Sequence, residues 1–236
     1  MIVLAMDSTA KTAAVGVERD GVCLADYRCN AGVTHSQILL PMALDALRSA
    51  GVSPAEVGAY AVTVGPGSFT GVRIGVSCVK GLAFGRELPC VPLSALEVLA
   101  EGLPYSDGLL CPVMDARRGE VYQALFRREE GKLVRLTEDR ALSIVSLAQE
   151  LRENYPEEKV YLAGDGSLPT AKCIPEAILP PRGSEAVGGA ALCACAHRAL
   201  EEGRVVTDAA LAPVYLRVPQ AERERLEREA AQKQNS

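Results

Sequence analysis

The most informative stretch of the sequence reads Gly65-Pro66-Gly67-Ser68-Phe69-Thr70-Gly71-Val72-Arg73-Ile74-Gly75. It follows the apolar run 59–64, which predicts a buried strand, and it opens an apolar segment of helical length, 70–85. Such a turn places backbone N–H groups where they can face an anion or another backbone. The glycine spacing matches neither the dinucleotide-binding motif nor the P-loop. The pattern alone favours a tight connection whose glycines allow close packing.

Composition and charge narrow the class of protein. The 236 residues are 48% hydrophobic and 23% charged, which is typical of a globular protein with one large or two small domains. A net charge of −5 and the absence of Trp argue against a surface that binds nucleic acid unaided. No apolar run reaches membrane-spanning length, and Met1 leads directly into a strand-like segment. We therefore expect a cytoplasmic protein without a membrane segment.

The order of predicted elements divides the chain into two lobes. Three short strands and then a helix, strand, helix and strand are the order of a ribonuclease-H-like lobe. These elements are predicted at 2–6, 13–18, 22–28, 37–50, 59–64, 70–85 and 88–93. The second half restarts with strands at 109–114, 120–127 and 133–136, a helix at 143–153, a strand at 159–162, an irregular stretch at 169–183 and a buried helix at 185–202. We expect lobes at 1–104 and 105–219, with the C-terminal part of the second packing back on the first, and a disordered tail at 220–236.

Two helices, 37–50 and 70–85, are apolar around most of their circumference. One face of each can pack on the sheet of its own lobe, and the remaining apolar surface needs a second cover. We predict that a partner protein supplies it, with glycines that let another helix approach closely. The alternative is that the second lobe covers both helices internally. The candidate contact residues are His35, Leu39, Met42, Gly71, Val72, Gly75 and Val79.

The sequence offers little catalytic chemistry. Asp7, Ser8 and Thr9 follow the first strand and, with Arg73, are candidates for a weak nucleotide site. The alternative is a polar trio that satisfies the backbone of its own turn. Asp115 and Asp165 are only nominal candidates for a catalytic acid, and no nucleophile with its base can be assembled. The eight cysteines form no C-x-x-C pair and there are only two histidines, so we expect free thiols and no bound metal.

The sequence resembles the TsaB (YeaZ) family, the non-catalytic paralogues in bacterial threonylcarbamoyladenosine synthesis. The resemblance rests on motifs in a fixed order between residues 4 and 217. They are Leu4-Ala5-Met6-Asp7-Ser8-Thr9, His35-Ser36, Leu39-Leu40-Pro41, the glycine-rich stretch 65–75, Lys80-Gly81-Leu82-Ala83, Asp115-Ala116-Arg117, Glu120-Val121-Tyr122, Gly164-Asp165-Gly166 and Pro213-Val214-Tyr215-Leu216-Arg217. The glycine-rich stretch is specific by itself, whereas the other motifs carry weight through their order.

The resemblance implies an α/β, two-lobe actin-like fold (ASKHA, ribonuclease-H-like) with mixed β-sheets flanked by helices. The family's catalytic relative, TsaD, carries a His-x-x-x-His metal pair shortly after the same turn and helix. This sequence has Ala95 and Leu99 at those places, and neither side chain can ligate a metal. The resemblance therefore implies a subunit without a catalytic centre.

The resemblance also implies the partners. A TsaD-like paralogue would bind the two apolar helices, and a TsaE-like ATPase would join the assembly. Together they transfer a threonylcarbamoyl group to the adenosine next to the anticodon of tRNAs that read codons beginning with A. We expect tRNA contact only through the complex, a homodimer when the chain is alone, and no cofactor except ATP or ADP held at the partner interface. The alternative is an enzyme of the same fold, either a kinase-like ATP-dependent enzyme or a glycoprotease-like peptidase.

Overall fold

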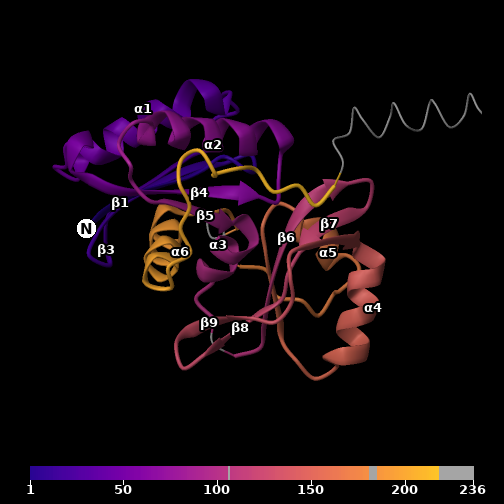
Figure 1. Cartoon of the computed structure of the whole chain (residues 1–236). Helices are drawn as coiled ribbons and strands as arrows, with labels where there is room; N and C mark the ends of the chain where they lie inside the picture. Colours follow the sequence, from indigo (N-terminus) through magenta and orange to yellow (C-terminus); the bar gives the residue numbers. More distant parts are fainter. Residues whose placement is uncertain (106, 181–184, 218–236) are drawn as a thin grey trace, which may run out of the picture.

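The computed structural model describes residues 1–105, 107–180 and 185–217, which form two lobes (Figure 1). The first lobe has a five-stranded sheet in the order β3-β2-β1-β4-β5. Strands β1 to β3 are antiparallel neighbours, and β4 and β5 run parallel to β1. The strands are β1 (Ile2–Asp7), β2 (Ala13–Arg19), β3 (Val22–Cys29), β4 (Val57–Gly65) and β5 (Cys90–Ser94). The tail predicted at 220–236 lies outside the described residues.

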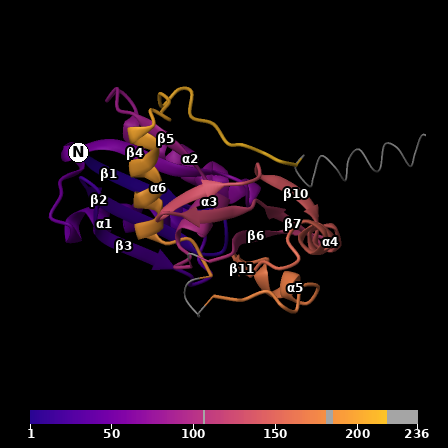
Figure 2. The same cartoon turned by 90° about the horizontal axis from the view of Figure 1, so that it is seen from below.

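Helices cover both faces of this sheet (Figures 1 and 2). One face carries α1 (His35–Ser49) and α2 (Phe69–Ala83), and the other carries α3 (Ala95–Glu101) and α6 (Gly189–Glu201). Side chains of β1 alternate between the two cores, since Leu4 and Met6 pack with α1 and α2 whereas Val3 and Ala5 pack with α3 and α6. Because both faces are buried, the central strands read as continuous apolar runs.

The second lobe contains a six-stranded sheet in the order β10-β7-β6-β8-β9, with β11 paired in parallel to β6. Its strands are β6 (Leu109–Arg117), β7 (Glu120–Gln123), β8 (Phe126–Glu129), β9 (Lys132–Arg135), β10 (Arg140–Ser143) and β11 (Val160–Ala163). The helices α4 (Ile144–Asn154) and α5 (Ser167–Ala171) accompany it, and a short 3-10 turn η1 (Pro54–Glu56) precedes β4 in the first lobe.

Helix α3 joins the two lobes through apolar and charged contacts. Its Leu96 and Leu99 share a core with Leu110 and Phe126 of the second sheet. The carboxylates of Glu97 and Glu101 lie 3.0 and 3.1 Å from the guanidinium of Arg198 on α6. Glu101 also pairs with Arg128, and Glu97 with Arg135, both on strands of the second lobe. The two sheets are therefore fixed to one short helix.

The predicted elements differ from the structure in four places. The strand predicted at 120–127 is two strands, because the chain turns away at Leu125, whose N–H donates to the Thr137 hydroxyl. Strand β10 was not predicted, since its four residues are too short to show a pattern. Helix α5 lies in part within the stretch predicted as irregular. Helix α6 begins at Gly189 instead of residue 185, while α1 begins at His35 and contains Pro41.

The glycine-rich turn packs on the turn that follows β1. The Ser68 N–H donates to the Thr9 carbonyl at 2.7 Å, and the Ser8 hydroxyl donates to the Gly71 carbonyl at 2.8 Å. A Cβ on Gly71 would overlap the Ser8 carbonyl oxygen, and a Cβ on Gly67 would reach 2.5 Å from that of Thr9. The packing interpretation of this stretch is confirmed at these two positions.

We expect Gly71→Ala to destabilise the protein by about 1–3 kcal/mol, because the added methyl group meets backbone that cannot move without shifting β1. Gly81→Ala on the same helix is the matched control, since no atom lies within 4 Å of its Cβ position. It should be neutral or stabilise the helix by up to about 1 kcal/mol. Chemical denaturation of both variants measures the difference. Equal effects would contradict the close backbone contact.

Candidate functional site

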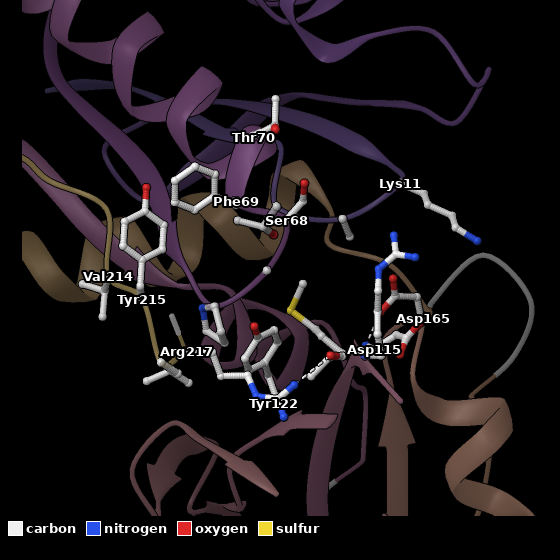
Figure 3. Close-up of a pocket in the computed structure, with 18 residues that line it drawn as sticks. Lys11, Ser68, Phe69, Thr70, Asp115, Tyr122, Asp165, Val214, Tyr215 and Arg217 are labelled. Atoms are coloured by element: carbon white, nitrogen blue, oxygen red, sulfur yellow. Dashed lines mark hydrogen bonds between the residues drawn. The ribbon is translucent and has the colours of Figure 1, made fainter. Parts of the chain in front are cut away.

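A cleft of about 400 Å³ lies between the two lobes (Figure 3). The turn after β1, the glycine-rich turn and the first residues of α2 form its wall on the first lobe. The end of β6, the turn after β11 and the chain segment 214–217 line the remaining sides. The polar side chains of the lining come from Thr9, Lys11, Ser68, Thr70, Asp115, Arg117, Tyr122, Asp165, Tyr215 and Arg217.

Two carboxylates meet at one end of this cleft. Asp115 is an exposed residue near the end of β6 and Asp165 follows β11, and the parallel pairing of these strands brings them together. The Asp115 N–H donates to Asp165 Oδ1 at 2.9 Å, while Asp115 Oδ1 accepts from the Arg117 N–H at 2.7 Å. Partial desolvation by the cleft walls, assisted by the negative charge of Asp115, raises the pKa of Asp165. Within the described residues, no group of three or more His, Cys, Asp or Glu side chains is arranged to hold a metal ion.

The residues predicted for a nucleotide site do not form one site. Asp7 and Ser8 are buried, and the Ser8 hydroxyl is committed to the Gly71 carbonyl. Thr9 lines the cleft, but its side chain donates to Asp7. Arg73 lines a different depression, between α1 and α2, and lies over the ring of Phe69. The Ser8 and Thr9 hydroxyls are therefore used within the fold, whereas Asp7 has hydrogen-bond partners for only one of its two carboxylate oxygens.

Asp7 is a buried carboxylate with one unpartnered oxygen. Its Oδ1 accepts hydrogen bonds from the Thr9 N–H, the Thr9 hydroxyl and the Thr63 hydroxyl. Its Oδ2 has no hydrogen-bond partner among the described residues, and the whole residue is 0% exposed. Burial raises the pKa of Asp7, and the three hydrogen bonds oppose that shift only in part.

A groove of about 620 Å³ runs between α1 and α2 on the outside of the first lobe. It is lined by residues of both helices, among them His35, Leu40, Phe69, Arg73, Ile74 and Cys78. The ring of His35 fixes the entry of α1, since its two nitrogens lie 3.2 Å from the carbonyl oxygens of Ser8 and Lys11. Leu40 and Leu44 are exposed on α1, and Phe84 is 80% exposed just after α2.

The structure corrects the choice of interface residues. Four of the predicted residues, Gly71, Val72, Gly75 and Val79, face the core of this chain, and Leu39 is buried as well but also lines the groove. Gly71 and Gly75 of α2 admit the Ser8 turn and Val62 of β4, so they do not make room for an outside helix, whereas Gly81 has no atom within 4 Å of its Cβ position. His35 and Met42 are partly exposed and remain available. That these helices bind a partner stays a prediction, and the residues that carry it now are the outward ones.

Comparison with known proteins places the chain in a family. A family model described as "TsaD: tRNA N6-adenosine threonylcarbamoyltransferase" matches residues 30–182. The TsaB tRNA threonylcarbamoyladenosine biosynthesis protein of Escherichia coli is 34% identical over 221 residues, which span 92% of this chain and 95% of that protein. The chain belongs to the TsaB family. The Bacillus subtilis TsaB protein is 33% identical over 71% of this chain and 73% of its own length.

Solved structures agree with the TsaB assignment. YeaZ from Pseudomonas aeruginosa superposes with a TM-score of 0.77 at 28% identity, over 91% of this chain and 99% of that chain. The ethanolamine utilization protein EutJ of Carboxydothermus hydrogenoformans shares the fold alone, with a TM-score of 0.51 at 15% identity. The predicted two-lobe, actin-like α/β fold is confirmed. Among the described residues, no helix is both long and apolar enough to cross a membrane.

Sequence reasoning missed part of the cleft. Lys11, Tyr215 and Arg217 line it, yet the latter two entered the sequence analysis only within a family motif. That motif was the available signal, because Pro213 to Arg217 show no periodicity that would place them beside α2. Ala95 and Leu99, at the positions of the TsaD metal pair in the resemblance, are buried in the core around α3.

We expect Asp7→Asn to flatten the pH dependence of stability. Because the folded-state pKa of Asp7 lies above its unfolded value, its contribution to stability is complete at low pH and is lost as the pH rises through the folded pKa. An amide keeps the acceptor for all three donors and never ionises. The variant should therefore gain stability relative to the wild type as the pH rises from about 4 to 7.

Thermal unfolding across that pH range makes this measurement, and Glu176→Gln, at an exposed carboxylate, is the control. If the wild type and Asp7→Asn lose the same amount of stability as the pH rises, the ionisation of Asp7 does not affect stability and the prediction is wrong.

Proposed function

We propose that this chain is a non-catalytic subunit in tRNA threonylcarbamoyladenosine synthesis, and that α1 and α2 bind a TsaD-type catalytic paralogue. The observation that carries the proposal is the groove between these helices, which is lined by Leu40, together with the exposed apolar side chain of Leu44 one turn farther along α1. An apolar depression on a surface otherwise rich in charge is typical of a protein–protein contact. Membership of the TsaB family supports the pathway, since relatives are named for it.

A supporting role, without catalysis, fits the chemistry of the cleft. Among the described residues that line the cleft with Asp115 and Asp165 there is no cysteine and no histidine. His35 is held at the start of α1, and His197 pairs with the buried Glu18 at 2.8 Å. The residues that line the cleft can orient a bound molecule and exclude solvent from it, but they supply no general base with an adjacent nucleophile.

The proposal includes the rest of the assembly. A TsaE-type ATPase would join the pair, and tRNA would be contacted only through the complex, because this chain has a net charge of −5. ATP or ADP, if held, would lie at the interface with the paralogue. Without the paralogue, the same apolar face would pair two copies of this chain about a two-fold axis. The cytoplasm, where tRNA is modified, is the expected location.

A second candidate function is a kinase-like ATP-dependent activity, favoured by the carboxylates of Asp115 and Asp165 in an interlobe cleft that also holds Lys11. Purified full-length chain incubated with ATP and Mg²⁺, without partners, separates the two candidates. We expect no turnover above a buffer blank. Sustained nucleotide hydrolysis that Asp115→Asn or Asp165→Asn abolishes would favour the enzyme instead. A glycoprotease-like peptidase has no comparable support, because the described residues offer no metal-binding cluster.

We expect Leu40→Glu to weaken binding of the TsaD-type paralogue at least about tenfold, because an unpaired carboxylate would be desolvated inside an apolar contact. Leu40 is 41% exposed in this chain, so the substitution is compatible with folding. Calorimetric titration of the paralogue measures the affinity, and reconstituted tRNA modification should fall in parallel at limiting concentrations of this chain.

Val145→Glu is the matched control, since Val145 is 69% exposed on α4 of the other lobe. It carries the same added charge and should bind like the wild type. If Leu40→Glu keeps its melting temperature and binds the paralogue with unchanged affinity, the groove is not the interface.

A further inference from the structure

The segment from Val206 to Arg217 follows the full length of α2 and then crosses to the second lobe (Figure 1). Val206 pairs with Cys90 at the edge of the first sheet, through backbone hydrogen bonds of 2.8 and 2.9 Å. The Lys80 ammonium, near the end of α2, donates to the carbonyl oxygens of Ala209 and Leu211, each at 3.1 Å. The Leu211 side chain is buried in the core beneath α2. We call residues 206–217 the strap.

The strap holds the first turn of α2 through Tyr215. The rings of Tyr215 and Phe69 stack with centroids 4.9 Å apart, side by side in Figure 3. Arg73 completes the cluster, since its Nε donates to the Tyr215 hydroxyl at 2.8 Å and its guanidinium carbon lies 4.0 Å from the Phe69 centroid. Stacked rings and a cation over a ring both stabilise such a cluster beyond the burial of its apolar surface.

Two residues farther on, Arg217 ties the strap to the second lobe. Its guanidinium donates to the Ala116 carbonyl at 2.9 Å and pairs with the carboxylate of Glu120. Ala116 and Glu120 flank the turn between β6 and β7. The Arg217 side chain is 16% exposed, so this pair is better shielded from solvent than an ordinary surface pair.

The Phe69–Arg73–Tyr215 cluster separates the interlobe cleft from the α1–α2 groove. Phe69 and Thr70 line both depressions, whereas Arg73 lines only the groove and Tyr215 only the cleft. Arg73 is the basic side chain of the groove lining, and its position is set by a residue that belongs to the strap. The Arg217 contact on the second lobe is thereby connected to the groove lining, first through the strap backbone from Arg217 to Tyr215 and then through the contacts of Tyr215 with Phe69 and Arg73.

We infer that Arg217 and Tyr215 are positioning residues: the strap, anchored on the second lobe, presets Phe69 and Arg73 for the partner that binds the α1–α2 groove. The inference rests on the proposed function of that groove. If the anchor at Arg217 is released, Tyr215 keeps only its first-lobe contacts, among them the neighbouring Val214 N–H bond to the Val64 carbonyl at 2.8 Å. Phe69 and Arg73 therefore become less ordered, and the partner must order them on binding. Ordering a long arginine side chain during binding costs conformational entropy. An Arg73 side chain that is already ordered in the free protein therefore raises the affinity without a new contact.

The first test is made on the full chain alone. Amide hydrogen exchange should be faster in peptides that cover residues 69–73 of Arg217→Ala than in the wild type. Tyr215→Phe, which keeps the stacked ring and loses the bond to Arg73, should give a smaller increase. Arg127→Ala is the matched control, because it removes a half-buried ion pair with Glu158 on the same lobe.

The second test measures affinity for the TsaD-type paralogue. Arg217→Ala should bind roughly fivefold more weakly or worse, whereas Arg127→Ala should bind like the wild type. If Arg217→Ala loses much more thermal stability than Arg127→Ala, Glu120→Gln replaces it, since it removes the same ion pair and leaves the bond to Ala116.

Unchanged exchange at 69–73 in a folded Arg217→Ala protein would overturn the inference, whatever the affinity. Faster exchange with unchanged affinity would overturn it too, and Leu40→Glu then locates the fault. If Leu40→Glu weakens binding, the groove is the interface and the strap does not preset it. If Leu40→Glu also binds normally, the proposed interface is wrong and the inference falls with it.

Discussion

The contact between two backbone turns determines the rest of this structure. The Ser8–Thr9 turn and the glycine-rich turn approach so closely that a Cβ on Gly71 would overlap the Ser8 carbonyl oxygen. Two hydrogen bonds, Ser68 to Thr9 and Ser8 to Gly71, hold them together. Because α2 starts within this contact, its direction is set by β1, and so are the groove that it forms with α1 and the cleft wall at its first turn.

The same contact explains why the glycine-rich turn is a structural element here. Its Ser68 amide donates to protein, and the polar groups of the Ser8–Thr9 turn are used within the fold. The cleft that remains is bordered by Asp115 and Asp165 across from Lys11, Ser68 and Thr70. Because these glycines have no Cβ, the two backbones can approach closely, which is the more common role of such a glycine pattern.

Much of the fold could be predicted from the sequence, and the reasons are local. Strands β1 and β4 are continuous apolar runs because both faces of the sheet are covered, and Ser94 caps α3 as its sequence indicates, accepting from the Glu97 N–H. Which side of an apolar helix faces the core is not decided locally, because it depends on contacts with residues far away in the sequence. Gly75 and Val79 face inward because of Ser8 and the sheet, and Tyr215 reaches Phe69 from 146 positions along the chain, so neither was predictable from periodicity.

The central claim is that α1 and α2 present the surface that binds a TsaD-type paralogue. The most direct measurement is an amide-exchange footprint of the full wild-type chain, with and without a saturating amount of the paralogue. The account predicts slower exchange in the peptides of 35–49 and 69–84, and little change over 140–155 on the second lobe. Protection confined to the second lobe, with α1 and α2 exchanging as in the free chain, would contradict it.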